Sequence, residues 1–312
     1  LHLSLRRQRQ MCIRDSITTV NLSNDKWNKT DAGLIAVGVF EDNSFTPMAE
    51  EINTASDGAF SQAVEIGDVK GKSGESHTFY LEGKRVLLLG LGKKEKYNAM
   101  SVRVAAGKAS RAAIGKKVDT VAIECLCIDC NHCQAVGEGL VLGSYQFLDY
   151  KTKGKNNFEL KSATVLGCTK EDITKGAAIA NAVCLARDLG NHPGNVTTPS
   201  RLVEAAIEIA DEGGMNLTVF DREEFTEMGM GGLAGVAQGT DEPPKFIVLE
   251  YMKGGDEKPK VIVGKGLTFD ACGISIKPAA KMDQMNYDMC RTDVFLGVFK
   301  ALAMLKPALN LF

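Results

Sequence analysis

The chain has 312 residues, of which 44% are hydrophobic and 24% are charged, and its formal net charge is −2. This length suits about two domains of roughly 150 residues each, and the near-neutral charge excludes a strong positive field for nucleic acid. The longest apolar runs, such as VLLLGLG at residues 86–92, are far shorter than the roughly 20 residues of a membrane helix, so no membrane span is expected. Nine cysteines without a credible secretory signal indicate a reducing, cytoplasmic location in which thiols stay free.

Residues 1–16, LHLSLRRQRQMCIRDS, do not have the pattern of a domain's first element. They are rich in arginine, show no helix or strand period, and lack the long apolar core of a signal peptide. We interpret them as a non-native or disordered leader and exclude them from the predicted fold. A basic targeting arm is the functional alternative.

Residues 17–161 alternate β-branched runs with helix-like patterns. An alanine-rich helix is predicted over residues 102–114, and the amphipathic residues 138–153 predict the domain's last helix and its exit. The predicted strands are LIAVGVF (34–40), RVLLLGL (85–91) and TVAIECLCI (120–128). This alternation predicts an α/β domain with a largely parallel sheet.

Four cysteines are clustered late in this domain, at Cys125, Cys127, Cys130 and Cys133, with His132 beside the last. Thiolates at such short spacing could close a tetrahedral zinc site. Against zinc, Cys125 and Cys127 fall inside the strand-like run, and no second distant pair completes a zinc finger. Partly buried free thiols are therefore the default interpretation.

Residues 162–190 are interpreted as a linker between two domains, made of a strand near Ser162–Gly167 and a helix over Glu171–Asp188. The turn NHPGN at residues 191–195 ends this helix, and a structural or surface role is expected for His192 within it.

The second domain is predicted over residues 191–312. A helix begins at Thr198-Pro199-Ser200, with the proline in its first turn. Strands are predicted over residues 216–220, 246–251 and 260–264, and a helix over 294–305. The third of these strands would deliver Lys265 to a strand end, where sites of open α/β sheets usually lie.

The stretch after that strand carries four charges, at Lys265, Asp270, Lys277 and Asp288, among apolar or small residues. Ionised lysine and aspartate are seldom buried unless they are paired or bind a metal. Their spacing alone is weak evidence for a site, since strand-end lysines and cap-forming aspartates are common.

The sequence motifs around these charges are more specific evidence than their spacing. The runs VGKGLTFD, GISIKPAA and MDQMNYDM, together with LARDLGNHPGNVTTPSRL at residues 185–202, resemble the leucyl aminopeptidase family, the M17 or cytosol aminopeptidases. The similarity extends through residues 228–251 to the chain end and, more weakly, back to about Ile17. The resemblance implies two αβα domains: a macro-like amino-terminal domain and a dinuclear-metal peptidase domain, here incomplete.

The resemblance further implies a homo-hexameric enzyme that removes N-terminal residues, leucine preferred, from peptides with a free amino terminus. Two divalent ions, manganese or zinc, would activate a water. Lys265, Asp270 and Asp288 match metal ligands, with Asp270 bridging both ions, while Lys277 matches the lysine that stabilises the developing oxyanion. Met285 matches a residue of the apolar pocket for the first side chain; alternatively it belongs to the core.

The chain also departs from the family pattern. Ala271-Cys272 stands where the family has Ser-Gly or a similarly small pair, and Arg291-Thr292-Asp293 stands where it has Gly-Ala-Ala, so Arg291 would clash with close packing or pair with Asp293. The chain stops at Phe312, before the family's NTDAEGR motif, which leaves three of five expected protein ligands. Little activity is therefore expected of residues 1–312 alone. A non-catalytic family member that acts through binding or assembly is the alternative, without specific support for nucleic acid.

Overall fold

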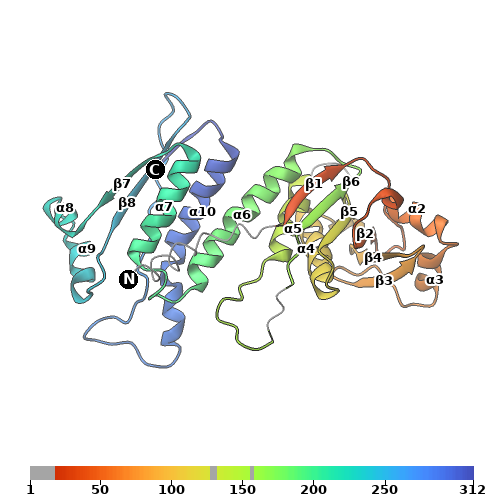
Figure 1. The fold of residues 1–312 in the computed structure, drawn as a ribbon, viewed down its shortest axis with the longest axis horizontal. Coiled ribbons are helices and arrows are strands. Elements are labelled where there is room, and N and C mark those ends of the chain that lie inside the picture. The colour runs from red at the N-terminus through yellow and green to blue at the C-terminus, as the bar shows by residue number, and fades with distance from the viewer. Residues whose placement is uncertain (1–17, 127–131, 155–157) are drawn as a thin grey trace, which may run out of the picture. The chain divides into compact units, whose positions relative to one another are not determined.

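The computed structural model of the chain describes residues 18–126, 132–154 and 158–312. It divides into two units, Leu1–Asn181 and Ala182–Phe312, and helix α6 (Glu171–Asn191) runs across the boundary between them (Figure 1). The predicted leader, residues 1–16, lies outside the described residues.

The first unit is organised around a six-stranded sheet with the order β1-β6-β5-β2-β4-β3 (Figure 1). All neighbours in it pair in parallel except β3 and β4, which are antiparallel. The strands are β1 (Thr19–Ser23), β2 (Leu34–Val39), β3 (Ser76–Leu81), β4 (Lys84–Gly90), β5 (Thr120–Glu124) and β6 (Ser162–Leu166). The α/β fold with a largely parallel sheet is thereby confirmed.

Helices cover both faces of this sheet, which explains why every residue of β2 is buried. One core joins the sheet to α4 and α5, and a second core joins its other face to α2 and α3. The helices are α2 (Pro47–Ala55), α3 (Ala59–Glu65), α4 (Ala99–Gly115) and α5 (Cys133–Ser144), with short 3-10 turns η1 (Trp27–Lys29) and η2 (Lys94–Lys96).

Two details of the first unit differ from the sequence-based expectation. Strand β6, expected in the linker, pairs with both β1 and β5 and so belongs to the first sheet. Helix α5 ends at Ser144 instead of continuing through residue 153, and it is buried on most sides rather than amphipathic. Its glycines explain this burial: Gly143 lies against the backbone of Gly107 in α4, and Gly137 lies against the backbone of Ile173 in α6.

The second unit has a small antiparallel sheet with the order β7-β8-β9. Its elements are α7 (Pro199–Gly213), β7 (Asn216–Phe220), α8 (Arg222–Glu227), α9 (Gly231–Val236), η3 (Ala237–Gly239), β8 (Phe246–Met252), η4 (Met282–Met289), α10 (Cys290–Leu305) and β9 (Asn310–Leu311). Helix α7 starts as predicted, with Pro199 in its first turn and the Thr198 hydroxyl accepting a hydrogen bond from the Arg201 N–H. Helices α7 and α10 pack together.

The prediction of a strand over residues 260–264 is wrong. Only Lys260 forms a bridge, in parallel with Leu311, and the Ile262 N–H donates one further bond to the Phe312 carbonyl at 2.9 Å. The run thus follows β9 through a few backbone hydrogen bonds at Lys260 and Ile262 and forms no strand of its own. Lys265 therefore lies in a loop.

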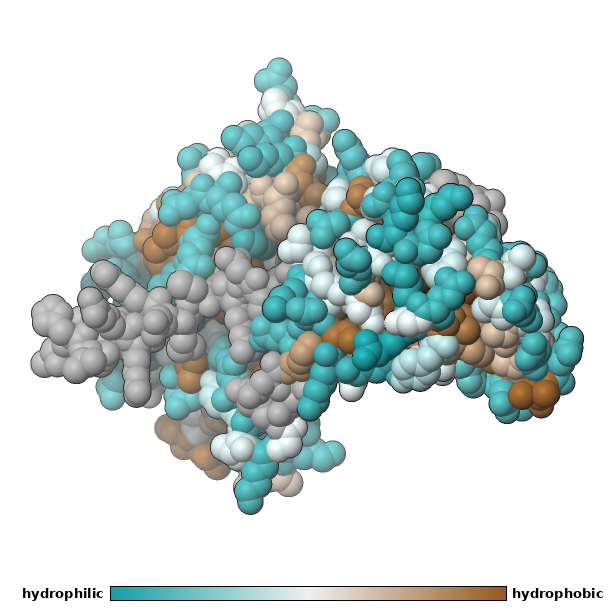
Figure 2. All heavy atoms as spheres, turned by 45° about the vertical axis from the view of Figure 1, so that its right-hand side comes forward, coloured by the Kyte–Doolittle hydropathy of each residue, from teal (hydrophilic) through white to brown (hydrophobic). Residues whose placement is uncertain are grey.

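No helix among the described residues is long and apolar enough to cross a membrane. On the face shown in Figure 2, hydrophilic side chains make up much of the coloured surface, with hydrophobic ones between them.

The close approach of α5 and α6 predicts that Gly137→Ala destabilises the first unit. A Cβ at this position would lie 1.9 Å from the Ile173 carbonyl oxygen, so the helices must separate, at a cost of about 1–3 kcal/mol. Gly115→Ala is the matched control, because a Cβ there meets nothing within 4 Å. Urea denaturation followed by circular dichroism measures both, and equal midpoints for the two variants would contradict the packing described.

Candidate metal and catalytic site

The four predicted charges lie in the loop between Lys260 and α10. Lys265, Asp270 and Lys277 precede the 3-10 turn η4, and Asp288 lies within it. No residue from 261 to 288 is buried as a whole. The loop approaches α10 at Gly264, where a Cβ would lie 2.7 Å from Cδ2 of Phe295. Only glycine permits this approach.

Two lysine–aspartate pairs bring the predicted residues together. Nζ of Lys265 lies 2.6 Å from Oδ2 of Asp288, and the Lys277 ammonium donates a hydrogen bond to Oδ2 of Asp270. Nζ of Lys277 also lies 3.4 Å from Sδ of Met285. The two groups also interact electrostatically, because Lys265 lowers the pKa of Asp270 and Asp288 raises the pKa of Lys277. The structure thus brings all five sequence-predicted site residues into one electrostatically coupled group.

The electrostatics of the second pair favour charge on both partners. The hydrogen bond from Lys277 lowers the pKa of Asp270, and a 3.0 Å bond from the Cys272 N–H lowers it further. The same contact with Asp270 raises the pKa of Lys277. Asp270 is therefore an anion and Lys277 a cation at neutral pH.

The donor set fits one divalent cation. Oδ2 of Asp288 is inaccessible and accepts no hydrogen bond of acceptable geometry, although Lys265 lies beside it. Carboxylate oxygens and a deprotonated amine are suitable ligands for manganese or zinc. Only two carboxylates contribute, however, and in the described part of the chain no third acidic, histidine or cysteine ligand atom joins them within 4.8 Å.

The departure at Ala271-Cys272 has a visible backbone cost. Cys272 has a φ of 67°, the left-handed region that glycine adopts freely and other residues adopt at about 1–2 kcal/mol. The Ser-Gly pair of the family pattern would place glycine at position 272, where the left-handed backbone favours it.

The departure at Arg291 and Asp293 is resolved in part. Arg291 is exposed, so it does not clash with the helix packing. Asp293, in the first turn of α10, is 1% exposed, and neither of its carboxylate oxygens has a hydrogen-bond partner among the described residues. Burial raises the pKa of Asp293 to about 7. The sequence did not predict that Asp293 is an isolated buried acid, because a salt bridge between Arg291 and Asp293 was one of the two expectations for Arg291.

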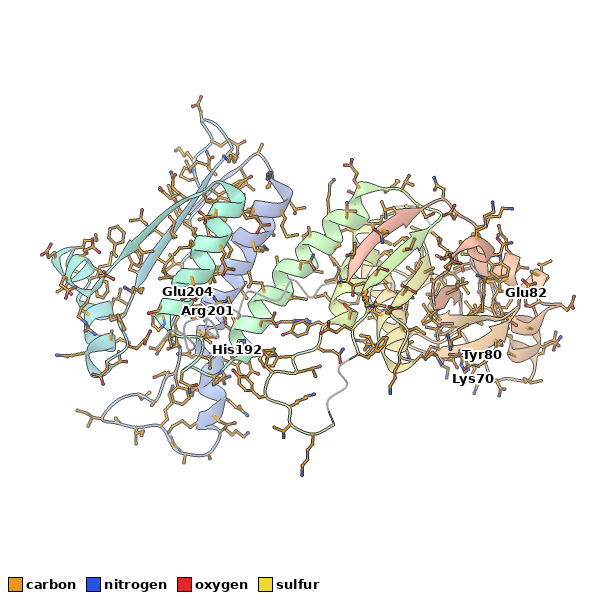
Figure 3. The ribbon with its side chains drawn as sticks, in the orientation of Figure 1. Lys70, Tyr80, Glu82, His192, Arg201 and Glu204 are labelled. Carbon is orange, nitrogen blue, oxygen red and sulfur yellow. The ribbon has the colours of Figure 1, made fainter. Side chains whose placement is uncertain are left out.

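The structure describes His192, but it describes only part of the predicted cysteine cluster. His192 follows the end of α6, and its N–H lies 3.3 Å from the Asp188 carbonyl oxygen, in the predicted turn region (Figure 3). The same view labels Arg201 and Glu204 of α7. Their side chains form an ion pair in which a guanidinium nitrogen lies 3.0 Å from a carboxylate oxygen. Cys127 and Cys130 lie outside the described residues.

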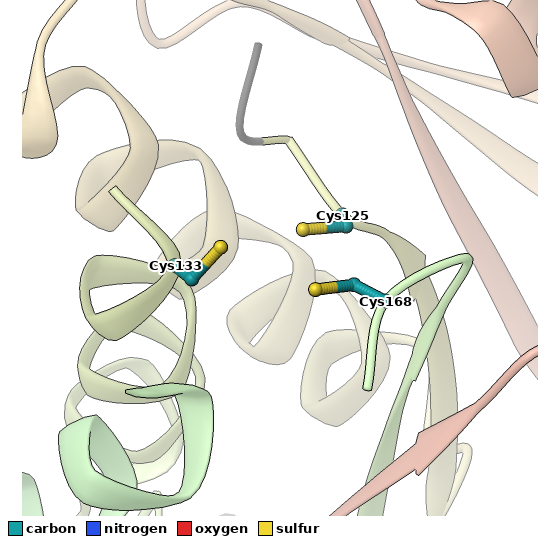
Figure 4. A group of neighbouring side chains, drawn as sticks. All are labelled: Cys125, Cys133 and Cys168. Carbon is teal, nitrogen blue, oxygen red and sulfur yellow. The ribbon is translucent and has the colours of Figure 1, made fainter. Parts of the chain in front are cut away.

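Cys125 and Cys133 are joined by Cys168, which sequence reasoning missed because it lies far along the chain. The ligand sulfur atoms of the three residues all lie within 4.8 Å of one another (Figure 4).

Comparison with known proteins identifies similar chains. Residues 36–154 match the model of the cytosol aminopeptidase family's N-terminal domain, and residues 184–312 match that of its catalytic domain. A probable cytosol aminopeptidase of Alkaliphilus metalliredigens is 36% identical over 309 residues, which are 92% of this chain and 61% of the relative. The chain thus spans about three fifths of that relative's length.

Solved structures give the same result. A mutant of tomato leucine aminopeptidase superposes with a TM-score of 0.81 at 26% identity, over 96% of this chain and 62% of that one. The bottromycin maturation enzyme BotP in complex with Mn superposes with a TM-score of 0.74 at 28% identity, over 90% of this chain and 58% of that one.

The isolated carboxyl of Asp293 predicts an unusual pH dependence of stability. Because burial in the folded state raises its pKa from the ordinary value of 3.8 to about 7, the folded state holds the proton more tightly, and stability falls as pH rises between these values. Asp293→Ala should therefore stabilise the chain by about 2 kcal/mol or more near pH 8, and the gain should shrink near pH 4. Thermal denaturation at both pH values measures this change in stability, and the substitution of an exposed residue, Asp283→Ala, is the control. A gain that does not depend on pH would contradict the assignment.

Proposed function

The chain belongs to the cytosol aminopeptidase family, and from this membership we propose that it supplies part of a metallo-aminopeptidase. The reaction is the release of N-terminal amino acids, leucine preferred, from peptides with a free amino terminus. The observation that carries the proposal is the convergence of Lys265, Asp270, Lys277 and Asp288 in one loop. A family likeness confined to the fold would not require these four charges to meet.

The complete subunit is proposed to hold two divalent ions, manganese or zinc, and the described residues supply Lys265, Asp270 and Asp288 as ligands. When bound, such ions lower the pKa of a water and polarise the scissile carbonyl. Support comes from the inaccessible Oδ2 of Asp288 and from the manganese complex of the similar enzyme BotP. An ammonium has no lone pair, so Lys265 must release a proton before it serves as a ligand.

Lys277 has a different role, because its contact with Asp270 favours the ammonium form. A fixed positive charge at this position stabilises the negative oxygen that develops on the substrate carbonyl. Met285 places its thioether 3.4 Å from that ammonium, which supports its assignment to the pocket for the substrate's first side chain. An unbranched thioether adapts to apolar side chains such as leucine.

We further propose that the complete protein is a cytoplasmic homo-hexamer without a membrane or nucleic-acid partner. Six apolar side chains in and around the site loop support assembly, because each is at least 44% exposed and burial of exposed apolar side chains against a partner is favourable. They are Val261, Val263, Phe269, Ile274, Ile276 and Tyr287.

The second candidate function is non-catalytic binding or assembly. It is favoured by two departures from the family pattern, the left-handed backbone of Cys272 and the buried Asp293, whose carboxylate oxygens have no hydrogen-bond partner among the described residues. The two candidates differ in metal binding and in turnover.

Metal titration tests the ligand assignment. Residues 1–312 should bind at most one Mn²⁺ ion, weakly, through Lys265, Asp270 and Asp288, and Asp270→Ala should abolish the binding. Manganese is the suitable probe because it prefers oxygen ligands to thiolates. Calorimetry measures stoichiometry and affinity, with Asp283→Ala as the control that keeps both. Two tight manganese sites in these 312 residues would contradict the ligand count.

Kinetics of the complete protein that contains this chain test the role of Lys277. Lys277→Ala should lower kcat about a hundredfold or more with little change in KM for a leucine amide, since the charge acts on the developing oxyanion. The exposed Lys258→Ala should leave both constants unchanged. Residues 1–312 alone should show little activity. A complete protein that loads two ions and cleaves no aminoacyl substrate would favour the non-catalytic function.

A further inference from the structure

Three cysteines from separate segments of the first unit converge at one edge of its sheet. Cys125 directly follows β5, Cys168 follows β6, and Cys133 begins α5. Strands β5 and β6 are parallel neighbours in which Glu124 pairs with Leu166, and the Cys125 N–H donates a hydrogen bond to the Leu166 carbonyl at 3.0 Å. The carboxyl ends of parallel strands meet at one edge, so Cys125 and Cys168 are brought together by the sheet itself.

The three sulfur atoms point into the same space (Figure 4) and lie within 4.8 Å of one another. Zinc–sulfur bonds of about 2.3 Å place the sulfurs of a tetrahedral site about 3.8 Å apart. Small side-chain rotations therefore suffice to close all three around one ion. None of the three forms a disulfide.

The surroundings suit a buried metal site rather than a reactive thiol. Cys133 is 1% exposed and Cys168 is 8% exposed, and both belong to the apolar core. Burial, the largest effect, raises the pKa of Cys168, and the neighbouring Cys125 raises it further, while the Lys170 N–H and the Cys133 thiol lower it. Buried thiols of this kind are protonated and unreactive on their own, and a bound cation is what displaces their protons.

The start of α5 adds a favourable field. Cys133 is its first residue, and His132 at the N-cap makes no side-chain capping hydrogen bond. The N–H groups of a first helical turn carry partial positive charge, which stabilises a thiolate beside them. Three thiolates with one divalent ion leave a single net negative charge for this field to offset.

We propose that Cys125, Cys133 and Cys168 bind one thiophilic divalent ion, zinc, in the first unit, with the fourth coordination position left to water. The site is independent of the aminopeptidase proposal, since its ligands lie in Leu1–Asn181 and those of the peptidase loop lie in Ala182–Phe312. Soft thiolate ligands select zinc over manganese or magnesium.

Cobalt substitution tests the proposal in the whole chain. Reduced, metal-free protein titrated with Co²⁺ should develop thiolate-to-cobalt charge-transfer absorption that saturates at one equivalent and disappears when Zn²⁺ is added. Cys168→Ser and Cys133→Ser should each lose most of this absorption. Cys184→Ser, a buried cysteine of α6 outside the cluster, should retain it, as should the double variant Asp270→Ala with Asp288→Ala.

Three results would overturn the proposal: no charge-transfer absorption in the reduced wild-type chain, unchanged absorption in Cys168→Ser, or loss of absorption in a Cys127→Ser, Cys130→Ser variant. Because a serine variant could misfold, circular dichroism accompanies each titration. The wild-type chain supplies an independent measurement, alkylation mapped by mass spectrometry under mild denaturant. Zinc should slow labelling of Cys125, Cys133 and Cys168 at least tenfold while that of Cys184, a buried cysteine outside the cluster, stays unchanged, and equal rates with and without zinc would contradict the site.

Discussion

Lys265 and Lys277 each lie against one aspartate, and these two ion pairs hold together a loop that has no buried residue between 261 and 288. Exposed ion pairs contribute little to stability individually. Here they act together with the close approach of Gly264 to α10 and with the bond from the Cys272 N–H to Asp270. The chemistry of the site therefore depends on contacts within the loop more than on a hydrophobic core beneath it.

The first unit is stabilised in the opposite way. Its sheet is covered on both faces, and its helices α4, α5 and α6 approach one another through glycines so closely that backbones touch. The pairing of β5 with β6 brings Cys125 and Cys168 together, and the packing of the helices supports this sheet. A site made of short, buried side chains is possible only on a support of this rigidity.

Much of the fold could be predicted from local patterns. The β-branched runs became β2, β4 and β5, and Thr198 with Pro199 marked the start of α7, because these signals act within a few residues. The expected strand over 260–264 did not form, because strand pairing depends on a distant segment that is not visible in the run itself, and only Lys260 makes a bridge beside β9. The charged residues of the site were predicted from their spacing and from the family-like sequence motifs around them. Cys168 and the isolation of Asp293 were not, because both depend on which distant side chains meet or fail to meet.

The pairing in the site loop has a consequence for ion selectivity. At Asp270 the Lys277 ammonium already lies beside the carboxylate, so the proposed divalent ion competes with it, and its net affinity is the difference between what the ion and the ammonium gain from that carboxylate. At Asp288 the proposed ion instead requires Lys265 to release its proton. An ion also accepts several ligands at once, which an ammonium with three directed hydrogens cannot do. Because all divalent ions have the same charge, discrimination among them at the proposed site should follow coordination number and ligand preference.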